Sequence, residues 1–329
     1  MQLYCIINIF IPLSKQTVHY LYTSTFNRDF MENKFEVIII GGSYAGLSAG
    51  MSLGRSLRSV LIIDGGKPCN RQTSHSHNFL TQDGKKPQDI SKVAREQVMK
   101  YPTVTFFEGN VLKTSKSSDG FDVETENGKR FFAKKIILAS GIKDIMPDIK
   151  GFPECWGISV IHCPYCHGYE VKDKTTGILS NGDLAFEFSK LVFNLSKNLT
   201  LFTNGKSTLN IEQTEKFKQN KIEIAEHEIQ EIIHENGHIV KVVFKNGQEK
   251  YLDALYAKIP FEQNINTEDL QLELTEHGFI KIDHYHKTSI EGVFACGDNT
   301  TMMRSVANAV AQGNFTGAMV NKELSDEGF

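Results

Sequence analysis

The sequence predicts an α/β protein made of two doubly wound, three-layer units, in which helices cover both faces of a parallel sheet. The apolar run 35–40 ends in glycines and is followed by a helical stretch at about 46–57 and a second apolar run at 59–64. A similar strand and helix pattern begins about 140 residues later, near Thr176. The length of 329 residues also favours about two domains.

Further strands and helices are predicted from alternation, apolar stripes and turn residues. Residues 104–138 alternate between strands and turns, with turns at Asp119-Gly120 and Asn127-Gly128. The second unit combines strands with one apolar-striped helix, and the chain closes with a hairpin, a strand and a helix. These elements are the strands 177–179 and 199–202, the helix 184–195, the hairpin strand 239–244, the strand 292–295 and the helix at about 303–324.

Composition excludes two classes of protein. Hydrophobic residues make up 40% and charged residues 23% of the chain, which is typical of a folded globular protein and not of a disordered one. The 36 Lys and Arg are balanced by 39 Asp and Glu, so the chain has no basic excess to neutralise a phosphate backbone. We therefore expect no nucleic-acid partner.

The first 30 residues are interpreted as a poorly structured extension that precedes Met31. Residues 3–13 are apolar, but a bilayer span needs about 20 apolar residues. The segment also has no basic start and no small-residue cleavage site, so we favour an extension over a targeting role. No later segment is apolar enough to span a membrane. We expect a cytoplasmic protein without a membrane partner.

The loop after the first strand has the pattern of a dinucleotide-binding turn. Gly41 and Gly46 occupy its first and sixth places, and Ser43 replaces the usual second glycine. Glycines there permit a tight turn and close helix packing, and the helix N-terminus that follows presents free N–H groups to phosphates. The candidate binding residues of this loop are Gly41, Gly42, Ser43, Ala45 and Gly46.

Asp64 completes this pattern at the end of the second strand, 23 residues beyond Gly41. A carboxylate at that place can accept hydrogen bonds from a ribose. The alternative is a tight strand-to-helix turn with no ligand. Because strand, loop, helix, strand and acid occur in the expected order, we favour dinucleotide binding.

Cys163 and Cys166 form a CxxC motif flanked by His162 and His167. At a helix start one of the two thiols is stabilised as thiolate, and the pair can close into a small disulfide that accepts two electrons. Zinc would require two further ligands at recognisable spacing, and a buried pair without chemistry is the other alternative. We favour redox chemistry, expect no metal, and assign His167 as a candidate proton carrier.

Four motifs together resemble the flavoprotein disulfide reductases, most closely the low-molecular-weight thioredoxin reductase family. They are the GGSYAG loop, the Ala139-Ser140-Gly141 turn, the CPYC pair and the FACGD motif that ends at Asp298. The resemblance covers about residues 34–324. It implies that the two units are Rossmann-like, that FAD is the cofactor and that the protein is a homodimer.

The resemblance also implies a discontinuous layout. Residues 31–144 and 259–329 would form the FAD-binding domain, and 145–258 an inserted, NAD(P)H-binding-like domain with the CxxC. Asp298 would bind the ribityl chain of the flavin. Further flavin contacts are expected from Gly141, Gly297, Ser305 and Val306.

The activity implied is the transfer of electrons from NADPH or NADH through FAD and the Cys163–Cys166 disulfide to a thioredoxin-like protein or a small disulfide. In this family Cys166 is the thiol near the flavin, and Cys163 is the thiol that exchanges with the substrate.

Two departures from the family pattern leave alternatives open. Ser180, Asn181 and Gly182 stand where the family has three glycines, and Lys206 is a single cation where it has arginines, so the electron donor stays open. His167 replaces an acidic residue, as in a branch of the fold that oxidises dithiols with oxygen. A dithiol oxidase and a redox sensor without turnover are therefore the alternatives, with the loop histidines at 75 and 77 as second proton carriers.

Overall fold

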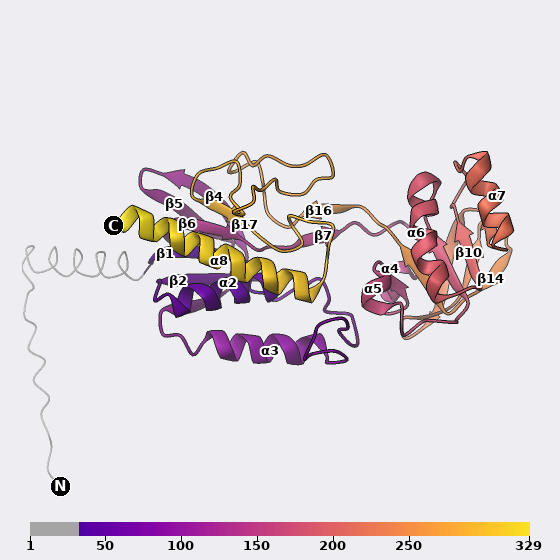
Figure 1. Cartoon of the computed structure of the whole chain (residues 1–329), viewed down its shortest axis with the longest axis horizontal. Coiled ribbons are helices and arrows are strands. Elements are labelled where there is room, and N and C mark those ends of the chain that lie inside the picture. Colours follow the sequence, from indigo (N-terminus) through magenta and orange to yellow (C-terminus); the bar gives the residue numbers. More distant parts are fainter. Residues whose placement is uncertain (1–32) are drawn as a thin grey trace, which may run out of the picture.

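The computed structural model describes residues 33–329, which form two α/β bodies joined by a narrow connection (Figure 1). The predicted extension 1–30 lies outside the described residues. Each body contains a parallel sheet with helices packed against it, which confirms the prediction of two Rossmann-like units.

The first body is built from both ends of the described chain. Its elements are β1 (Lys34–Ile40), α2 (Tyr44–Arg55), β2 (Val60–Asp64), α3 (Pro87–Val98), β3 (Val104–Glu108), β4 (Val111–Ser117), β5 (Gly120–Thr125), β6 (Arg130–Leu138), β17 (Val293–Ala295) and α8 (Val306–Gly328). Strands follow the order β3-β2-β1-β6-β5-β4, and β17 pairs with the C-terminal end of β6. Strands β1, β2, β3, β6 and β17 run parallel to one another. Strands β4 and β5 pair antiparallel to each other, and β5 pairs antiparallel to β6.

The central strands β1 and β2 are buried on both faces, as the continuous apolar runs predict. Helices α2, α3 and α8 cover one face with an apolar cluster. The other face packs against β5 and the loop segments before β17. The predicted helix 46–57 lies at 44–55, and the alternating segment 104–138 forms β3 to β6.

Two helices of this body differ from the prediction. The last helix begins at Val306 and not near 303, because Ser305 has an extended backbone and its Oγ accepts a hydrogen bond from the Asn308 amide at 3.2 Å. Helix α3 was not predicted. It buries only Pro87, Ile90 and Val98, so its apolar stripe is too thin to indicate a helix.

Glycines allow α8 to lie directly on α2. A Cβ placed on Gly313 would lie 2.0 Å from the Ala45 carbonyl oxygen, and one on Gly317 would lie 2.7 Å from the Ala49 carbonyl oxygen. Such separations are far below van der Waals contact, so side chains at both positions would force the helices apart. The contact fixes α8 beside the glycine loop.

We therefore expect Gly313→Val to destabilise the protein by about 1–3 kcal/mol or more through overpacking. Gly328→Val is the matched control, because no atom lies within 4 Å of a Cβ at that end of α8. Urea unfolding followed by circular dichroism measures both midpoints. Equal midpoints for the two variants would contradict the assigned packing.

The second body contains a parallel sheet and a smaller antiparallel sheet. Its elements are α4 (Phe152–Cys155), β8 (Val160–Ile161), α5 (Pro164–His167), β9 (Thr176–Leu179), α6 (Gly182–Leu195), β10 (Leu199–Phe202), α7 (Ile211–Gln219), β11 (Glu223–Ala225), β12 (Ile229–Glu235), β13 (His238–Phe244), β14 (Glu249–Tyr251) and β15 (Ala254–Ala257). The parallel order is β11-β10-β9-β15-β8, and β12, β13 and β14 form the antiparallel sheet. The predicted strands 177–179 and 199–202 are β9 and β10.

Two short strands carry the chain out to the second body and back. They are β7 (Ile142–Asp144) and β16 (Phe261–Gln263), which pair antiparallel and lie between the two bodies in Figure 1. An exposed ion pair joins Lys143 to Glu262 at 2.7 Å across this ribbon. The ribbon holds α4 and α5 on the side of the second body that faces the first.

Candidate functional site

The glycine loop between β1 and α2 forms a tight turn with an open helix start. Gly41 has a φ of +105°, and a Cβ there would lie 2.2 Å from the Ala139 carbonyl oxygen. A Cβ on Gly46 would lie 1.8 Å from the Gly41 carbonyl oxygen. Ser43 is the N-cap residue of α2, but its side chain makes no capping hydrogen bond. The amides of the first turn, including that of Ala45, are therefore free of a side-chain cap and suited to an anion.

Asp64 lies beside this loop at the end of β2. Its Oδ1 accepts a hydrogen bond from the Gly42 amide at 3.0 Å, and its Oδ2 accepts one from the Gly66 amide at 3.3 Å. These bonds hold the carboxylate at the edge of the loop. The partly exposed side chain keeps capacity for further donors, such as ribose hydroxyls.

Segments far apart in the sequence converge on the same sheet edge. Gly297 follows β17 with a φ of +89°, its amide donates to Gln312 Oε1 at 2.7 Å, and a Cβ there would lie 3.0 Å from the Ala45 Cβ. Gly141 follows β6 with a φ of +66° and nothing near its missing Cβ. Ser305 and Val306 begin α8 at the same end of the body.

Buried polar atoms next to Asp298 have no hydrogen-bond partner within the described chain. They are Asn299 Oδ1, Gln263 Oε1 and Arg304 Nε. Buried polar atoms are rarely left unsatisfied, so these atoms indicate room for a polar ligand or water. Burial raises the pKa of Asp298 to about 6, and Arg304, with its Nε 3.7 Å from the carboxylate, opposes that rise.

The set of groups fits a flavin dinucleotide. Open amides at the α2 start suit its pyrophosphate, Asp64 suits a ribose, and Asp298 with the unsatisfied atoms around it suits the polar chain that leads to the ring. These groups lie at the carboxyl ends of parallel strands, where such folds bind their ligands.

The dithiol lies at the start of α5. Cys163 is the N-cap residue, and its Sγ accepts a hydrogen bond from the Cys166 amide at 3.2 Å. Cys166 Sγ lies 3.9 Å from the Arg304 carbonyl oxygen. Arg304 belongs to the first body, so the dithiol faces the predicted flavin site across the junction of the two bodies.

The two thiols have opposite tendencies to ionise. A hydrogen bond from Cys166 lowers the pKa of Cys163 to about 7, and backbone donors and Lys258 add to the decrease. The same hydrogen bond, together with burial, raises the pKa of Cys166. Cys163 is therefore the thiol suited to exchange with a substrate near neutral pH, since the thiolate is the nucleophile.

His167 follows directly and is half-buried, and its two buried ring nitrogens have no hydrogen-bond partner among the described residues. Burial lowers the pKa of His167, Glu170 opposes this and His77 adds to it. His77 Nδ1 lies 3.5 Å from Glu170 Oε1 and 3.7 Å from Asp83 Oδ1. The ring of His75 lies 6.4 Å from that of His77. A neutral His167 can accept a proton, and His77 of the first body is near enough to affect its pKa.

A buried ion pair at the junction was missed from the sequence. The Arg304 guanidinium donates to both oxygens of Asp144, at 2.9 and 3.1 Å. Trp156 Nε1 donates to Asp144 Oδ2 at 3.1 Å, and Cys69 Sγ lies 3.0 Å from Arg304 Nη2. Asp144 and Arg304 are 160 residues apart, so nothing in the spacing indicates that they meet.

In the loop between β9 and α6, which corresponds to the glycine loop of the first body, side chains make hydrogen bonds at the helix start. Asn181 Oδ1 accepts hydrogen bonds from the Gly182 amide at 2.9 Å and from the amide and hydroxyl of Thr208 at 2.9 and 3.1 Å. Asn181 Nδ2 donates to the Lys206 carbonyl oxygen at 2.9 Å. These hydrogen bonds hold the loop after β10 against the start of α6. A fold of this kind binds phosphate at that helix start.

A carboxylate adds to this closure. Asp183 lies in the first turn of α6, and its Oδ1 accepts a hydrogen bond from Gln213 Nε2 at 2.7 Å. A negative charge already at the helix start repels a phosphate. The sequence indicated the missing glycines of this loop but not the hydrogen bonds that Asn181 and Asp183 make there.

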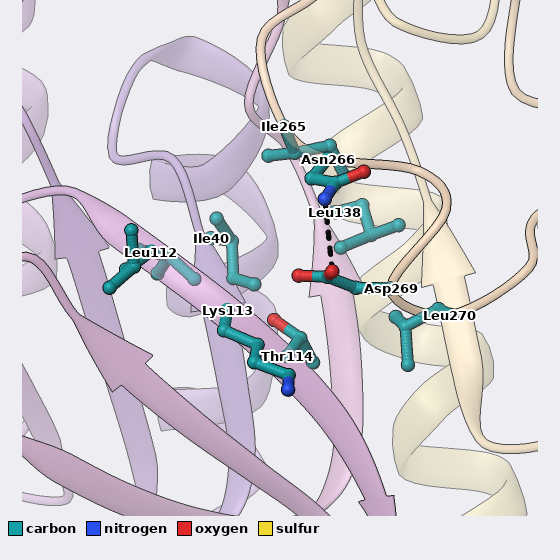
Figure 2. Close-up of a pocket in the computed structure, with 10 residues that line it drawn as sticks. Ile40, Leu112, Lys113, Thr114, Leu138, Ile265, Asn266, Asp269 and Leu270 are labelled. Carbon is teal, nitrogen blue, oxygen red and sulfur yellow. Dashed lines mark hydrogen bonds between the residues drawn. The ribbon is translucent and has the colours of Figure 1, made fainter.

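A small cavity lies on the other face of the first sheet (Figure 2). Ile40 and Leu138 line it at the ends of β1 and β6, and Asn266 Nδ2 donates to Asp269 Oδ1 at 2.9 Å in the covering loop. Its volume is about 10 Å³, which is room for about one water. None of the predicted catalytic residues lines it.

Residues 33–329 contain neither a cluster of metal-ligating side chains nor a membrane-spanning helix. No group of three or more His, Cys, Asp or Glu side chains in this range is arranged to hold a metal ion. No helix in the same range is long and apolar enough to cross a membrane.

Fold and site together define a class: an α/β protein with a dinucleotide-type loop in one body and a reactive dithiol in the other. A family model of the pyridine nucleotide-disulphide oxidoreductases matches residues 35–313. Thioredoxin reductase tcpT of Claviceps purpurea is 33% identical over 304 residues, which cover 89% of this chain and 95% of that protein. Thioredoxin reductase sirT of Leptosphaeria maculans is 31% identical over 317 residues, covering 87% and 93%.

Among solved structures, an oxidoreductase from Agrobacterium tumefaciens has a TM-score of 0.83 and 37% identity, covering 89% of this chain and 99% of that one. The chain therefore belongs to the pyridine nucleotide-disulphide oxidoreductase family and is thioredoxin reductase-like.

Proposed function

We propose that this protein is a flavin-dependent oxidase of dithiols, in which substrate thiols reduce the Cys163–Cys166 disulfide. The observation that supports this direction is the closed start of α6. Because Asn181 and Thr208 are hydrogen-bonded to each other at the start of α6, where such folds bind phosphate, we expect the second body to bind a nicotinamide nucleotide poorly. Electrons would then enter through the dithiol.

The cofactor in this proposal is FAD, held by the first body. Its ligands would be Gly41, Gly42, Ser43, Ala45, Gly46 and Asp64 at the first loop, and Gly141, Gly297, Asp298, Ser305 and Val306 at the neighbouring segments. The domain limits proposed are 31–144 with 259–329 for the FAD-binding domain and 145–258 for the inserted domain. FAD, when bound, would take up two electrons and pass them to dioxygen.

The thiol chemistry proceeds by two exchanges. A substrate thiolate attacks Cys163 Sγ in the enzyme disulfide, which forms a mixed disulfide and releases Cys166 as thiolate. The second substrate thiol attacks the mixed disulfide, so the substrate leaves as a disulfide and Cys163 is released. Overall, one dithiol and one O₂ give one disulfide and one H₂O₂.

His167 would manage the protons of these exchanges. Its neutral ring can accept a proton from an incoming thiol and return it to the Cys166 thiolate. The absence of a hydrogen-bond partner for its ring nitrogens in the described chain leaves both of them free for this task. The substrate would be a small dithiol or a thioredoxin-like protein.

A second candidate is the opposite direction, an NAD(P)H-dependent disulfide reductase. It is supported by the names of tcpT and sirT, which are both thioredoxin reductases. In that case the loop around Asn181 and Thr208 would have to open to admit the nucleotide.

An anaerobic absorbance titration distinguishes the two directions. Aliquots of the purified protein with its flavin receive NADPH, NADH or dithiothreitol in separate cuvettes. We expect dithiothreitol alone to bleach the flavin band, and admission of air to restore it with formation of hydrogen peroxide. Rapid bleaching by either nicotinamide would overturn the oxidase and support the reductase.

A further inference from the structure

A lysine follows the strand that pairs with β8, the strand before the dithiol. Strands β8 and β15 are parallel neighbours, with Leu255 opposite Val160 and Tyr256 opposite Ile161. Continuing this register beyond both strands places position 258 beside position 163. Lys258 and Cys163 therefore leave the same edge of the sheet side by side.

The ammonium of Lys258 is held at this edge. Its Nζ lies 4.9 Å from the centre of the Phe188 ring in α6, and that ring packs edge-on against Tyr256 at 5.8 Å. Lys258 keeps contact with solvent, and burial of the rest of its side chain lowers its pKa. Its interaction with Cys163 is mutual: Lys258 lowers the pKa of Cys163, and Cys163 opposes the decrease that burial causes in the pKa of Lys258.

We propose that Lys258 acts through Cys163, stabilising its thiolate from the end of β15 and selecting it as the reactive sulfur. An opposite charge close to a thiol favours the thiolate. Lys258 is thus a positioning residue that belongs to neither the CxxC motif nor the flavin loops. The inference rests on the proposed function only in taking Cys163 as the exchanging thiol.

Other charged or titratable groups surround the pair on every side. They are His162, Cys166, His167 and Glu170 around α5, Tyr256 on β15, and Asp298 and Arg304 from the first body. Among these, Arg304 and Asp298 act on Cys166, whereas the cation that lowers the pKa of Cys163 is Lys258. Lys258 also interacts with Cys166 and His162, so the effect of removing its charge has to be measured on Cys163 itself.

The test is the pH dependence of Cys163 alkylation in the reduced, flavin-bound protein. Iodoacetamide is added at a series of pH values, and modification of the Cys163 peptide is followed by mass spectrometry. We expect the wild-type rate to be half-maximal near pH 7, the pKa of Cys163. In Lys258→Met the midpoint should rise by about 0.5–1 unit, which slows alkylation at pH 6 by about 3- to 10-fold.

Two controls separate charge from structure. Lys258→Arg should retain the wild-type midpoint, since the charge remains. Lys250→Met removes a lysine on β14 that pairs with Glu223 and should leave the midpoint unchanged. A wild-type midpoint in Lys258→Met would overturn the inference. Alkylation needs no turnover, so a failed oxidase assay leaves this test intact.

Discussion

Replacement of Cys166 by serine is expected to leave flavin bound but to reduce dithiol turnover by about 10³-fold or more, because the enzyme disulfide can no longer form. Cys163 keeps its place at the α5 start but has no sulfur partner, so a substrate dithiol finds no enzyme disulfide to attack. Peroxide production measures turnover, and the absorbance of the flavin band measures whether the cofactor stays bound.

Cys155→Ala is the control for this variant. Cys155 is a buried free thiol in α4, and burial raises its pKa to about 11, so it has no part in exchange at neutral pH. It should retain turnover. Normal turnover by Cys166→Ser would remove the role proposed for the pair, whichever direction the enzyme runs.

Asp144→Ala is expected to lower the free energy of unfolding by about 3–5 kcal/mol. The side chains of Asp144 and Arg304 are only 4% and 14% exposed, so the change removes both Asp144 acceptors of a buried guanidinium and leaves it the more distant Asp298 carboxylate, 3.7 Å from Nε. Trp156 Nε1 also loses its acceptor. Urea unfolding, followed by tryptophan fluorescence and circular dichroism, measures the loss.

Lys143→Ala tests the neighbouring residue of the same strand. Its ion pair with Glu262 is exposed, with side chains 67% and 52% accessible, and exposed pairs contribute about 0–1 kcal/mol. A loss in Asp144→Ala no larger than that of Lys143→Ala would show that the junction does not depend on the buried pair.

Local patterns in the sequence were sufficient to predict the central parallel strands of the first sheet. Continuous apolar runs identify β1, β2 and β6 because these strands are buried on both faces. Helices α3 and α7 were not predicted from the sequence, because each of them buries few side chains. In α7 the buried residues are Gln213 and Phe217. Their helical form depends on caps and tertiary contact more than on an apolar stripe.

The parts of the site that lie within one short segment could be predicted from the sequence. The contacts between segments that are distant in sequence could not. The placement of Cys163 at a helix start follows from the spacing of one short segment. By contrast, the Asp144–Arg304 pair and the approach of Lys258 to Cys163 arise from chain segments distant in sequence. A single sequence carries no record of such contacts, since only packing brings the segments together.

The connection through β7 and β16 has a consequence for the order in which the protein assembles during synthesis. Strand β6 leaves the ribosome well before its partner β17, and the whole second body is made between them. Until α8 emerges, the apolar face of α2 that it covers stays open to solvent. The second body, whose parallel sheet comes from one continuous stretch of chain, can close first. The first body should therefore be most prone to aggregation before α8 has been synthesised. Its need for chaperones should be greatest during that interval.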